Sequence, residues 1–389
     1  MATNVDALAS TIPGLSTSDG GFSAFGLGAA GNGATLNGLS VSAADLPREV
    51  GRGLRFLTSP WDPSIGGFAG ALAALSLARG GNVSSSSGHL RLDHPALQFS
   101  DAIAERAGRR FLDIALSQGG SGAVDLDALY YNYGVQVSRR SVSTASLLTA
   151  EANLLSNSGV SADSAARLLQ IVKSQHIPLS RPGIPSERIT TTVSFAGQLD
   201  HVVPIIPASS VPLASWSLTG IGAYSQSEAL GLTATATAGT AGMSSNANAV
   251  LQAKYVTFIG DRGTVVSQTN TGVNVTRRTY SPYLKLPSAI VLINSTLPDG
   301  SSALGTLTFG GNGAADSRTT SWGWETTQLV EWLYGGIPNR PLRWYFQSKL
   351  EGFAQETASS GFGSFSYPSL AALAANTPSG FNRILSLPS

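Results

Sequence analysis

Residues 250–280 read VLQAKYVTFIGDRGTVVSQTNTGVNVTRRTY, and this stretch carries the clearest structural signal in the chain. Apolar and polar side chains alternate over Val250–Ile259 and again over Val273–Tyr280, with the period of two that is typical of half-buried strands. Two groups of turn residues, Asp261-Arg262-Gly263 and Asn270-Thr271-Gly272, interrupt the alternation. The stretch therefore predicts short antiparallel strands joined by tight turns.

The same pattern extends over residues 187–311. The other candidate strands are Ile189–Ala196, Val202–Ile206, Ala214–Tyr224, Leu232–Ala238, Gly263–Ser267, Ala289–Asn294 and Leu304–Phe309. Eight or nine short strands follow one another over about 125 residues, and no helical pattern lies between them. This region therefore predicts an antiparallel β-sandwich that resembles a jelly roll.

Helical periodicity is indicated on both sides of this region. The candidate helices span residues 66–79, 101–117, 143–155, 161–175, 325–334, 341–356 and 368–375. In the fourth of these, Ser161 is a suitable N-cap, and Asp163 and Lys173 suit the two ends of the helix dipole. Leu168 and Val172 lie on its apolar side.

The order of helical, β and helical segments predicts an α+β fold, in which a helical domain built from both chain ends carries an inserted antiparallel β-sandwich domain. The predicted parts are a Gly/Ser-rich arm (1–45), the first helical part (46–186), the sandwich (187–311) and the second helical part (312–389). Clustered proline and glycine residues mark the joins on both sides of the sandwich.

Composition limits the classes of function. Charged residues make up 12% of the 389 residues, against about 25% in an ordinary protein. A bias of the source genome explains this, and so does a surface covered by neighbouring subunits. The net charge is +1 and no basic block occurs, so we expect no sequence-specific nucleic acid partner.

The absence of cysteine excludes disulfides and thiolate metal sites. The longest apolar run, Phe68–Ala78, is well short of the roughly 20 residues of a spanning helix. The N-terminus also lacks the charged start and apolar run of a signal peptide. We therefore expect a soluble protein with no membrane span, made in the cytoplasm.

No histidine pattern indicates a metal site within one chain. The four histidines are His89, His94, His176 and His201. The first two are five residues apart, a spacing that does not place both on one helical face. A single histidine per subunit that meets its copies on a symmetry axis stays open.

Two short motifs have simpler explanations than chemistry. Gly26-Leu-Gly28-Ala-Ala-Gly31 matches the dinucleotide-binding pattern G-x-G-x-x-G, but no apolar strand precedes it, so we interpret it as part of a flexible arm. Asp125-Leu-Asp127 resembles a D-x-D metal motif and is interpreted as a helix cap before an apolar segment.

Two carboxylates near tryptophans raise the question of a glycosidase cleft. Glu325 and Glu331 lie among Trp322, Trp324 and Trp332. Six residues apart on a helix, they would not share a face, and aromatic clusters are common in cores and interfaces. We therefore expect no enzyme, no catalytic residue, no cofactor and no metal.

The predicted architecture resembles the trimeric intermediate-layer capsid proteins of reoviruses, in which a helical base carries a jelly-roll domain. The resemblance covers the chain from about residue 46 onward and includes no shared motif. It implies a structural capsid protein of a double-stranded RNA virus that self-assembles as homotrimers, packs on other capsid proteins in the virion and is assembled in the host cytoplasm.

A second function is a carbohydrate- or receptor-binding β module on a helical oligomerisation base. It requires an aromatic-lined pocket in residues 187–311, where Trp216 is the strongest candidate. Few other aromatic residues occur there, which makes this alternative weaker.

Overall fold

The structure is a computed structural model. It describes residues 14–18, 21–24, 32–40, 46–57, 70–97, 111–180, 182–202, 214–259, 265–332, 342–356 and 361–384.

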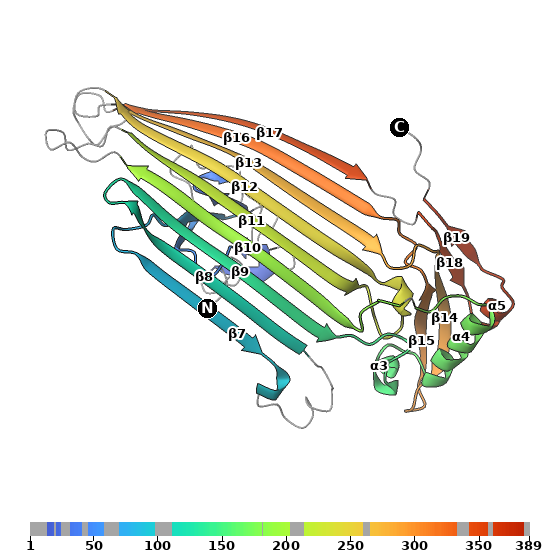
Figure 1. Cartoon of the computed structure of the whole chain (residues 1–389). Helices are drawn as coiled ribbons and strands as arrows, with labels where there is room; N and C mark the ends of the chain where they lie inside the picture. Colours follow the sequence, from blue (N-terminus) through green and yellow to red (C-terminus); the bar gives the residue numbers. More distant parts are fainter. Residues whose placement is uncertain are drawn as a thin grey trace.

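A long sheet of nine antiparallel strands dominates the molecule (Figure 1). Its strands are β7 (Ser85–Asp93), β8 (Phe111–Asp125), β9 (Leu129–Ser143), β10 (Glu187–Val202), β11 (Ala214–Leu230), β12 (Gly242–Ile259), β13 (Val265–Pro282), β16 (Ser317–Trp332) and β17 (Leu342–Glu356). Each strand pairs with the next in this order, so β7 and β17 form the two edges.

The strands are longer than the alternating segments of the sequence. β12 and β13 pair without interruption from Gly242↔Pro282 to Ile259↔Val265. The predicted turn at Asn270-Thr271-Gly272 lies in the middle of β13, so that prediction is wrong. Asn270 is only 2% exposed, and a bond to another part of the chain occupies its amide.

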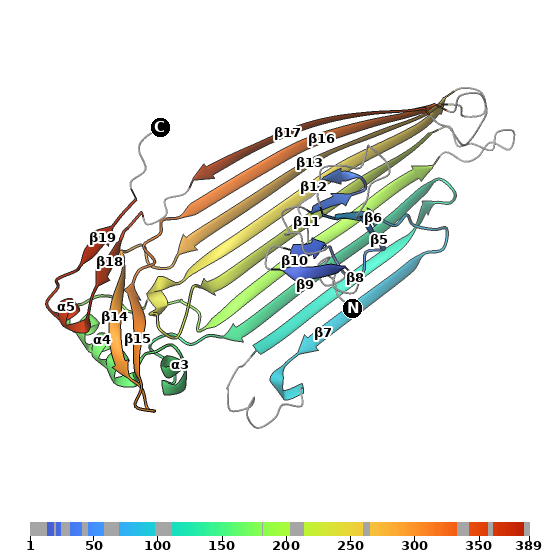
Figure 2. The ribbon, with the colours of Figure 1, turned by 180° about the vertical axis from the view of Figure 1, so that it is seen from behind.

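A smaller unit lies at one end of the long sheet (Figures 1 and 2). It contains a four-stranded sheet and three short helices: β14 (Ser288–Thr296), β15 (Ser302–Gly310), β18 (Ser364–Tyr367), β19 (Gly380–Asn382), α3 (Ala152–Asn157), α4 (Ala162–Ser174) and α5 (Leu370–Ala374). Leu168 and Val172 of α4 pack with Val291, Leu307 and Phe309 of the strands in the largest apolar core of the described residues.

The N-terminal part contributes short strands that lie against one face of the long sheet (Figure 2). β3 (Gly33–Leu36), β4 (Leu39–Ser40), β5 (Arg52–Leu57) and β6 (Leu72–Leu77) form a four-stranded sheet, and β1 (Leu15–Ser18) pairs with β2 (Gly21–Ala24). We call described residues 32–40, 46–57 and 70–80 the N-terminal layer. None of the helices in the described part of the chain is long and apolar enough to cross a membrane.

The predicted α+β fold class, with a helical domain and an inserted β-sandwich, is wrong. Residues 342–356 and 325–332 were expected to be helical and are strands, as are residues 72–77 and 111–117. Residues 101–110 lie outside the described part. Two predicted helices are confirmed, because α4 begins after Ser161, whose hydroxyl accepts a bond from Ser164 N, and α5 covers Leu370–Ala374.

The physical reason is that apolar spacing in β17 fits both periods. Leu342, Phe346 and Leu350 recur every four residues, which suits a helix, and the same positions also lie on one side of a strand. Pairing with β16 decides between the two, for example Trp324 with Leu350. The division of the chain at residues 45, 186 and 311 stays a prediction.

Candidate functional site

The two faces of the nine-stranded sheet differ in chemistry. Directly paired residues of antiparallel strands point to the same side, and neighbours along a strand point to opposite sides. On β11, Trp216 and Leu218 are on one side, and Ser217 and Thr219 are on the other. We call the side of Leu218 the outer face and the side of Thr219 the inner face.

The outer face is apolar and exposed. It carries Leu90, Leu92, Ile114, Leu116, Val135, Val137, Val193, Phe195, Leu199, Trp216, Leu218, Tyr224, Leu251, Tyr255, Ile259, Val273, Val275, Trp322, Trp324, Trp332, Leu342, Trp344, Phe346 and Leu350. A contiguous apolar surface of this size marks contact with another apolar phase or partner.

The inner face is polar, and its centre is buried. Its buried side chains include Ser117, Asn132, Ser194, Gln198, Asp200, Thr219, Gln252, Asn270, Glu325 and Thr327. The N-terminal layer covers them, so their hydrogen bonds must come from each other or from this layer.

Asn37 is the central anchor of the layer. It lies in the turn between β3 and β4 with a positive φ of 51°, and Gly38 follows it with φ 92°. Its Nδ2 donates to Gln198 Oε1 (3.2 Å) and to Thr219 Oγ1 (3.0 Å), and its Oδ1 accepts from Leu77 N (3.2 Å). One side chain thus joins two strands of the nine-stranded sheet, which we call the wall, to the layer. The Asn-Gly pair is a hairpin signal that the sequence interpretation passed over within its Gly/Ser-rich arm.

Asn132 of β9 is a second anchor. Its Nδ2 donates to the carbonyls of Gly51 (2.9 Å) and Ala78 (2.7 Å), and its Oδ1 accepts from Gly51 N (3.3 Å). Glycines allow this close approach, since a Cβ on Gly134 would lie 2.8 Å from Val50 N and one on Gly119 would lie 2.5 Å from Glu49 O. The layer therefore packs closely against the sheet at Gly119 and Gly134, because these positions have no side chain.

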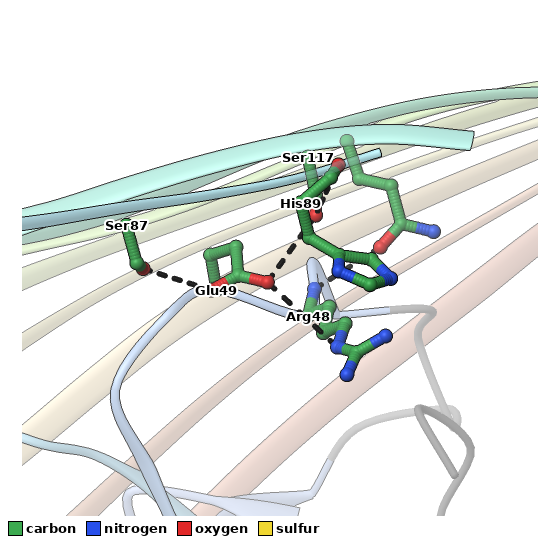
Figure 3. Close-up of polar contacts among 6 residues, drawn as sticks. Arg48, Glu49, Ser87, His89 and Ser117 are labelled. Atoms are coloured by element: carbon green, nitrogen blue, oxygen red, sulfur yellow. Dashed lines mark hydrogen bonds and ion pairs between the residues drawn. The ribbon is translucent and has the colours of Figure 1, made fainter. Parts of the chain in front are cut away.

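Glu49 holds the layer to the edge of the sheet (Figure 3). Its Oε2 accepts from Ser87 Oγ (2.8 Å), and its Oε1 accepts a longer bond from Ser117 Oγ (3.4 Å). The neighbouring Arg48 lies 3.7 Å from the same carboxylate, and its main-chain N donates to Gln136 Oε1 (3.1 Å). These contacts connect the layer to β7, β8 and β9.

Glu325 holds the opposite side of the layer. Its Oε2 accepts from Ser40 N (2.9 Å), and its Oε1 accepts from Gln347 Nε2 of β17 (2.6 Å). Glu331 lies six residues further along the same strand and pairs with Arg343 (3.4 Å). Contrary to the helical interpretation, both carboxylates are on the inner face. They lie about 20 Å apart at about 3.4 Å per residue, too far to act as a catalytic pair.

The structure spreads the four histidines over the chain. His89 is on the inner side of β7, His94 Nδ1 accepts from Ala96 N (3.1 Å), and His176 follows α4 with φ 57°. His201 stacks on Trp216 of the outer face at 5.4 Å between ring centroids. No group of three or more His, Asp or Glu residues that could hold a metal occurs in the described ranges.

The remaining motifs do not form a site in the described residues. Asp127 lies in the turn between β8 and β9 with φ 62° and accepts a bond from Asn82 Nδ2 (2.6 Å), so the predicted helix cap is wrong. The Gly26–Gly31 motif lies outside the described residues. The expected absence of catalytic, cofactor-binding and metal-binding residues stays a prediction.

Comparisons with known proteins identify the type of fold. The outer membrane transporter YddB from Escherichia coli is similar over 94% of this chain and 48% of its own, with a TM-score of 0.56 and 12% identity. The ferric-catecholate import receptor Fiu from E. coli K12 matches over 92% of this chain and 58% of its own, with a TM-score of 0.48 and 12% identity. No family model and no curated protein matches the sequence.

The chain therefore has a fold like that of an outer membrane transporter and spans about half of YddB's length. The two similar proteins are described as a transporter and a receptor, not as enzymes. At 12% identity, the likeness to YddB concerns the fold alone.

The interpretation as a reovirus-like capsid protein is wrong, because the helical base and the inserted sandwich on which it depended are replaced by a transporter-like sheet. The expectations that came with it are wrong for the same reason: homotrimers in a virion shell, capsid-protein partners and assembly in the host cytoplasm. The expectation of a soluble protein with no membrane span depended on the lack of a long apolar run. It is overturned by the likeness to an outer membrane transporter, a kind of protein that crosses its membrane with strands. The module on a helical oligomerisation base is wrong too, since the described helices are short and pack on the small sheet.

Proposed function

We propose that the chain forms part of the wall of a transport protein in a bacterial outer membrane. The outer face contacts lipid, and the inner face borders the solute path, which the N-terminal layer closes. The apolar outer face opposite a polar inner face carries the proposal, since strands in such membranes alternate between lipid-facing apolar and inward polar residues. The transporter-like fold supports it.

The length of the apolar band along a strand fits a membrane. On β11 the outer positions between Trp216 and Tyr224 are Leu218, Gly220 and Gly222. Residues 216 to 224 are nine residues and cover about 27 Å along the strand at about 3.4 Å per residue. A tilted strand that crosses an outer membrane has about 9–11 residues, with aromatic residues at both ends of its apolar part.

The band ends in charged residues. Arg139 follows Val137 at the next outer position of β9, and Arg277 follows Val275 in the same way on β13. Arginine at the end of an apolar band places its charge at the lipid–water boundary. The outer face is thus apolar where lipid tails would lie and charged where head groups would lie.

The proposal includes additional strands beside the sheet. Neither β7 nor β17 has a strand partner on its free side in the described part of the chain. An open strand edge cannot lie in lipid, because its backbone groups would lack hydrogen bonds. Additional strands would complete the wall.

Tryptophan fluorescence tests the lipid contact without any substitution. Trp216, Trp322, Trp324, Trp332 and Trp344 all lie on the outer face. The full chain would be reconstituted into vesicles whose acyl chains carry bromine, which quenches indole at short range. We expect strong quenching relative to vesicles without bromine. Fluorescence that is unchanged by bromine would contradict the proposal.

A further inference from the structure

A cavity of about 600 Å³ lies beyond the N-terminal layer on the inner face of β13, β16 and β17. Ser40 of the layer borders one side of it, and the three strands lie next to one another in the sheet (Figure 1). This volume is in the range of cavities that hold small organic ligands.

The strand register directs chemically varied side chains into this cavity. Asn274 and Arg278 come from β13, Ser321 comes from β16, and Lys349 and Phe353 come from β17. Pairing places Thr276 opposite Ser321 and Ser321 opposite Phe353. All of these residues are on the side of Glu325, the inner face.

Several of these groups are uncommitted. The Arg278 guanidinium, the Asn274 amide and the Ser321 hydroxyl make no side-chain hydrogen bond or ion pair with any described residue. Lys349 pairs with Glu351 at 2.7 Å, so the cavity keeps one net positive charge from two cations and one carboxylate. A free guanidinium with hydroxyl and amide groups nearby is equipped to bind an anion that also carries hydroxyls.

Phe353 adds an apolar platform. The residue is 77% exposed and lies on the polar inner face, so its ring is accessible to a ligand in the cavity. Exposed aromatic rings stack on the flat rings of ligands.

We propose that this cavity binds a small organic anion that joins a phosphate or carboxylate to hydroxyl groups and a flat ring. A nucleoside monophosphate has all three and can be divided into parts that lack one of them. Arg278 holds the anionic group, Asn274 and Ser321 bind hydroxyls, and Phe353 stacks on the ring. The inference rests on the proposed function in one respect only: the bound anion would be the solute that the path accepts.

Calorimetry on the full chain in detergent separates the contributions of the anionic group, the hydroxyl groups and the ring to the binding free energy. The probes are AMP, adenosine without the phosphate, and ribose 5-phosphate without the ring. We expect AMP to bind more tightly than either of the others. No binding of AMP at millimolar concentration, or equal binding of AMP and adenosine, would overturn the proposal.

Two adjacent arginines supply a matched control, because Arg277 points to the outer face and Arg278 into the cavity. Arg278→Gln should weaken AMP binding at least about tenfold, the cost of a lost charged hydrogen bond, and leave adenosine unchanged. Arg277→Gln should bind like the parent chain. Arg278→Lys, which keeps the charge and guards against misfolding, should give an intermediate affinity. Equal effects of both Gln variants would overturn the assignment.

A second pair of substitutions tests the contact between Phe353 and the flat ring of the ligand. Phe353→Ala should weaken AMP and adenosine a few-fold and spare ribose 5-phosphate, since stacking is absent there. Phe346→Ala on the outer face should change none of the three. An equal loss for ribose 5-phosphate would contradict stacking. If bromine quenching succeeds and AMP fails, this inference alone falls; if AMP binds and quenching fails, the membrane proposal falls and the site stands.

Discussion

The side-chain amide of Asn270 donates a 2.8 Å hydrogen bond to the main-chain carbonyl of Asn37, a residue 233 positions earlier in the chain. This bond connects the middle of β13 to the turn of the N-terminal layer. Together with the bonds of Asn37 to Gln198 and Thr219, it shows that the layer meets the wall through directed polar contacts. An apolar cluster lies beside these bonds, to which the long sheet contributes Ala196, Ile221 and Val250 and the layer contributes Leu36, Leu46, Val50, Leu75 and Leu77.

Asn37→Ala should loosen the layer. It removes donors from two wall residues and leaves Leu77 N without its acceptor, so we expect a loss of about 1–3 kcal/mol. Hydrogen exchange at Leu77 and in β3 measures it. Asn82→Ala is the control, since its bond to Asp127 is exposed and should cost under about 0.5 kcal/mol. Equal effects of the two changes would contradict an anchoring role.

Gly134→Ala should push the layer away from the wall. The new Cβ would lie 2.8 Å from Val50 N and 3.0 Å from Val50 Cβ, so either the layer or β9 must move. We expect destabilisation above about 1 kcal/mol, as in other overpacked sites, and faster proteolysis near Val50. Gly220→Ala on the outer face meets no atom within 4 Å and should be neutral. An unaltered Gly134→Ala variant would show that the layer is not in close contact.

Solute release from vesicles tests whether the layer closes a path. A double variant, Asn37→Ala with Asn132→Ala, removes both anchors and should release a trapped small solute faster than the parent chain does, because opening becomes less costly. Ser161→Ala in the small unit should release it at the parent rate. Equal rates for all three chains would contradict the closing role.

Ser161→Ala should in turn destabilise α4. The Ser161 hydroxyl accepts from Ser164 N at 3.3 Å, and loss of an N-cap costs about 1 kcal/mol. Urea unfolding followed by circular dichroism measures the change. Ser174→Ala, at the other end of the helix, should have less effect. A neutral Ser161→Ala would mean that the cap bond contributes nothing.

Local signals in the sequence predicted the structure where local interactions decide it. The helix with Ser161, Asp163 and Lys173 formed as predicted, because its cap, dipole charges and apolar side agree. Strands in the region of Val250–Ile259 also formed, since alternation there fits only one period. The turn predicted at Asn270-Thr271-Gly272 does not form. These residues lie within a strand, where Asn270 binds the N-terminal layer.

Long-range pairing decided the rest. Residues 325–332 and 342–356 fit a helix by spacing, yet they pair with each other, and Trp332 stacks on Trp344 at 6.4 Å between centroids. A long apolar run is the signal of a spanning helix, whereas β11 has Trp216, Leu218 and Tyr224 on its outer face and Ser217, Thr219 and Ser225 on its inner face. Such a pattern is weak in any single strand and becomes clear when neighbouring strands are aligned.

The most direct test of the lipid-facing wall uses two adjacent residues of β11. Leu218 points to the outer face and Ser217 to the inner face, and the chain has no native cysteine. Each would be replaced by cysteine, labelled with bimane and reconstituted into brominated-lipid vesicles. We expect the Leu218→Cys label to be strongly quenched and the Ser217→Cys label to be largely protected. Equal quenching, or stronger quenching at residue 217, would contradict the assignment of the outer face to lipid.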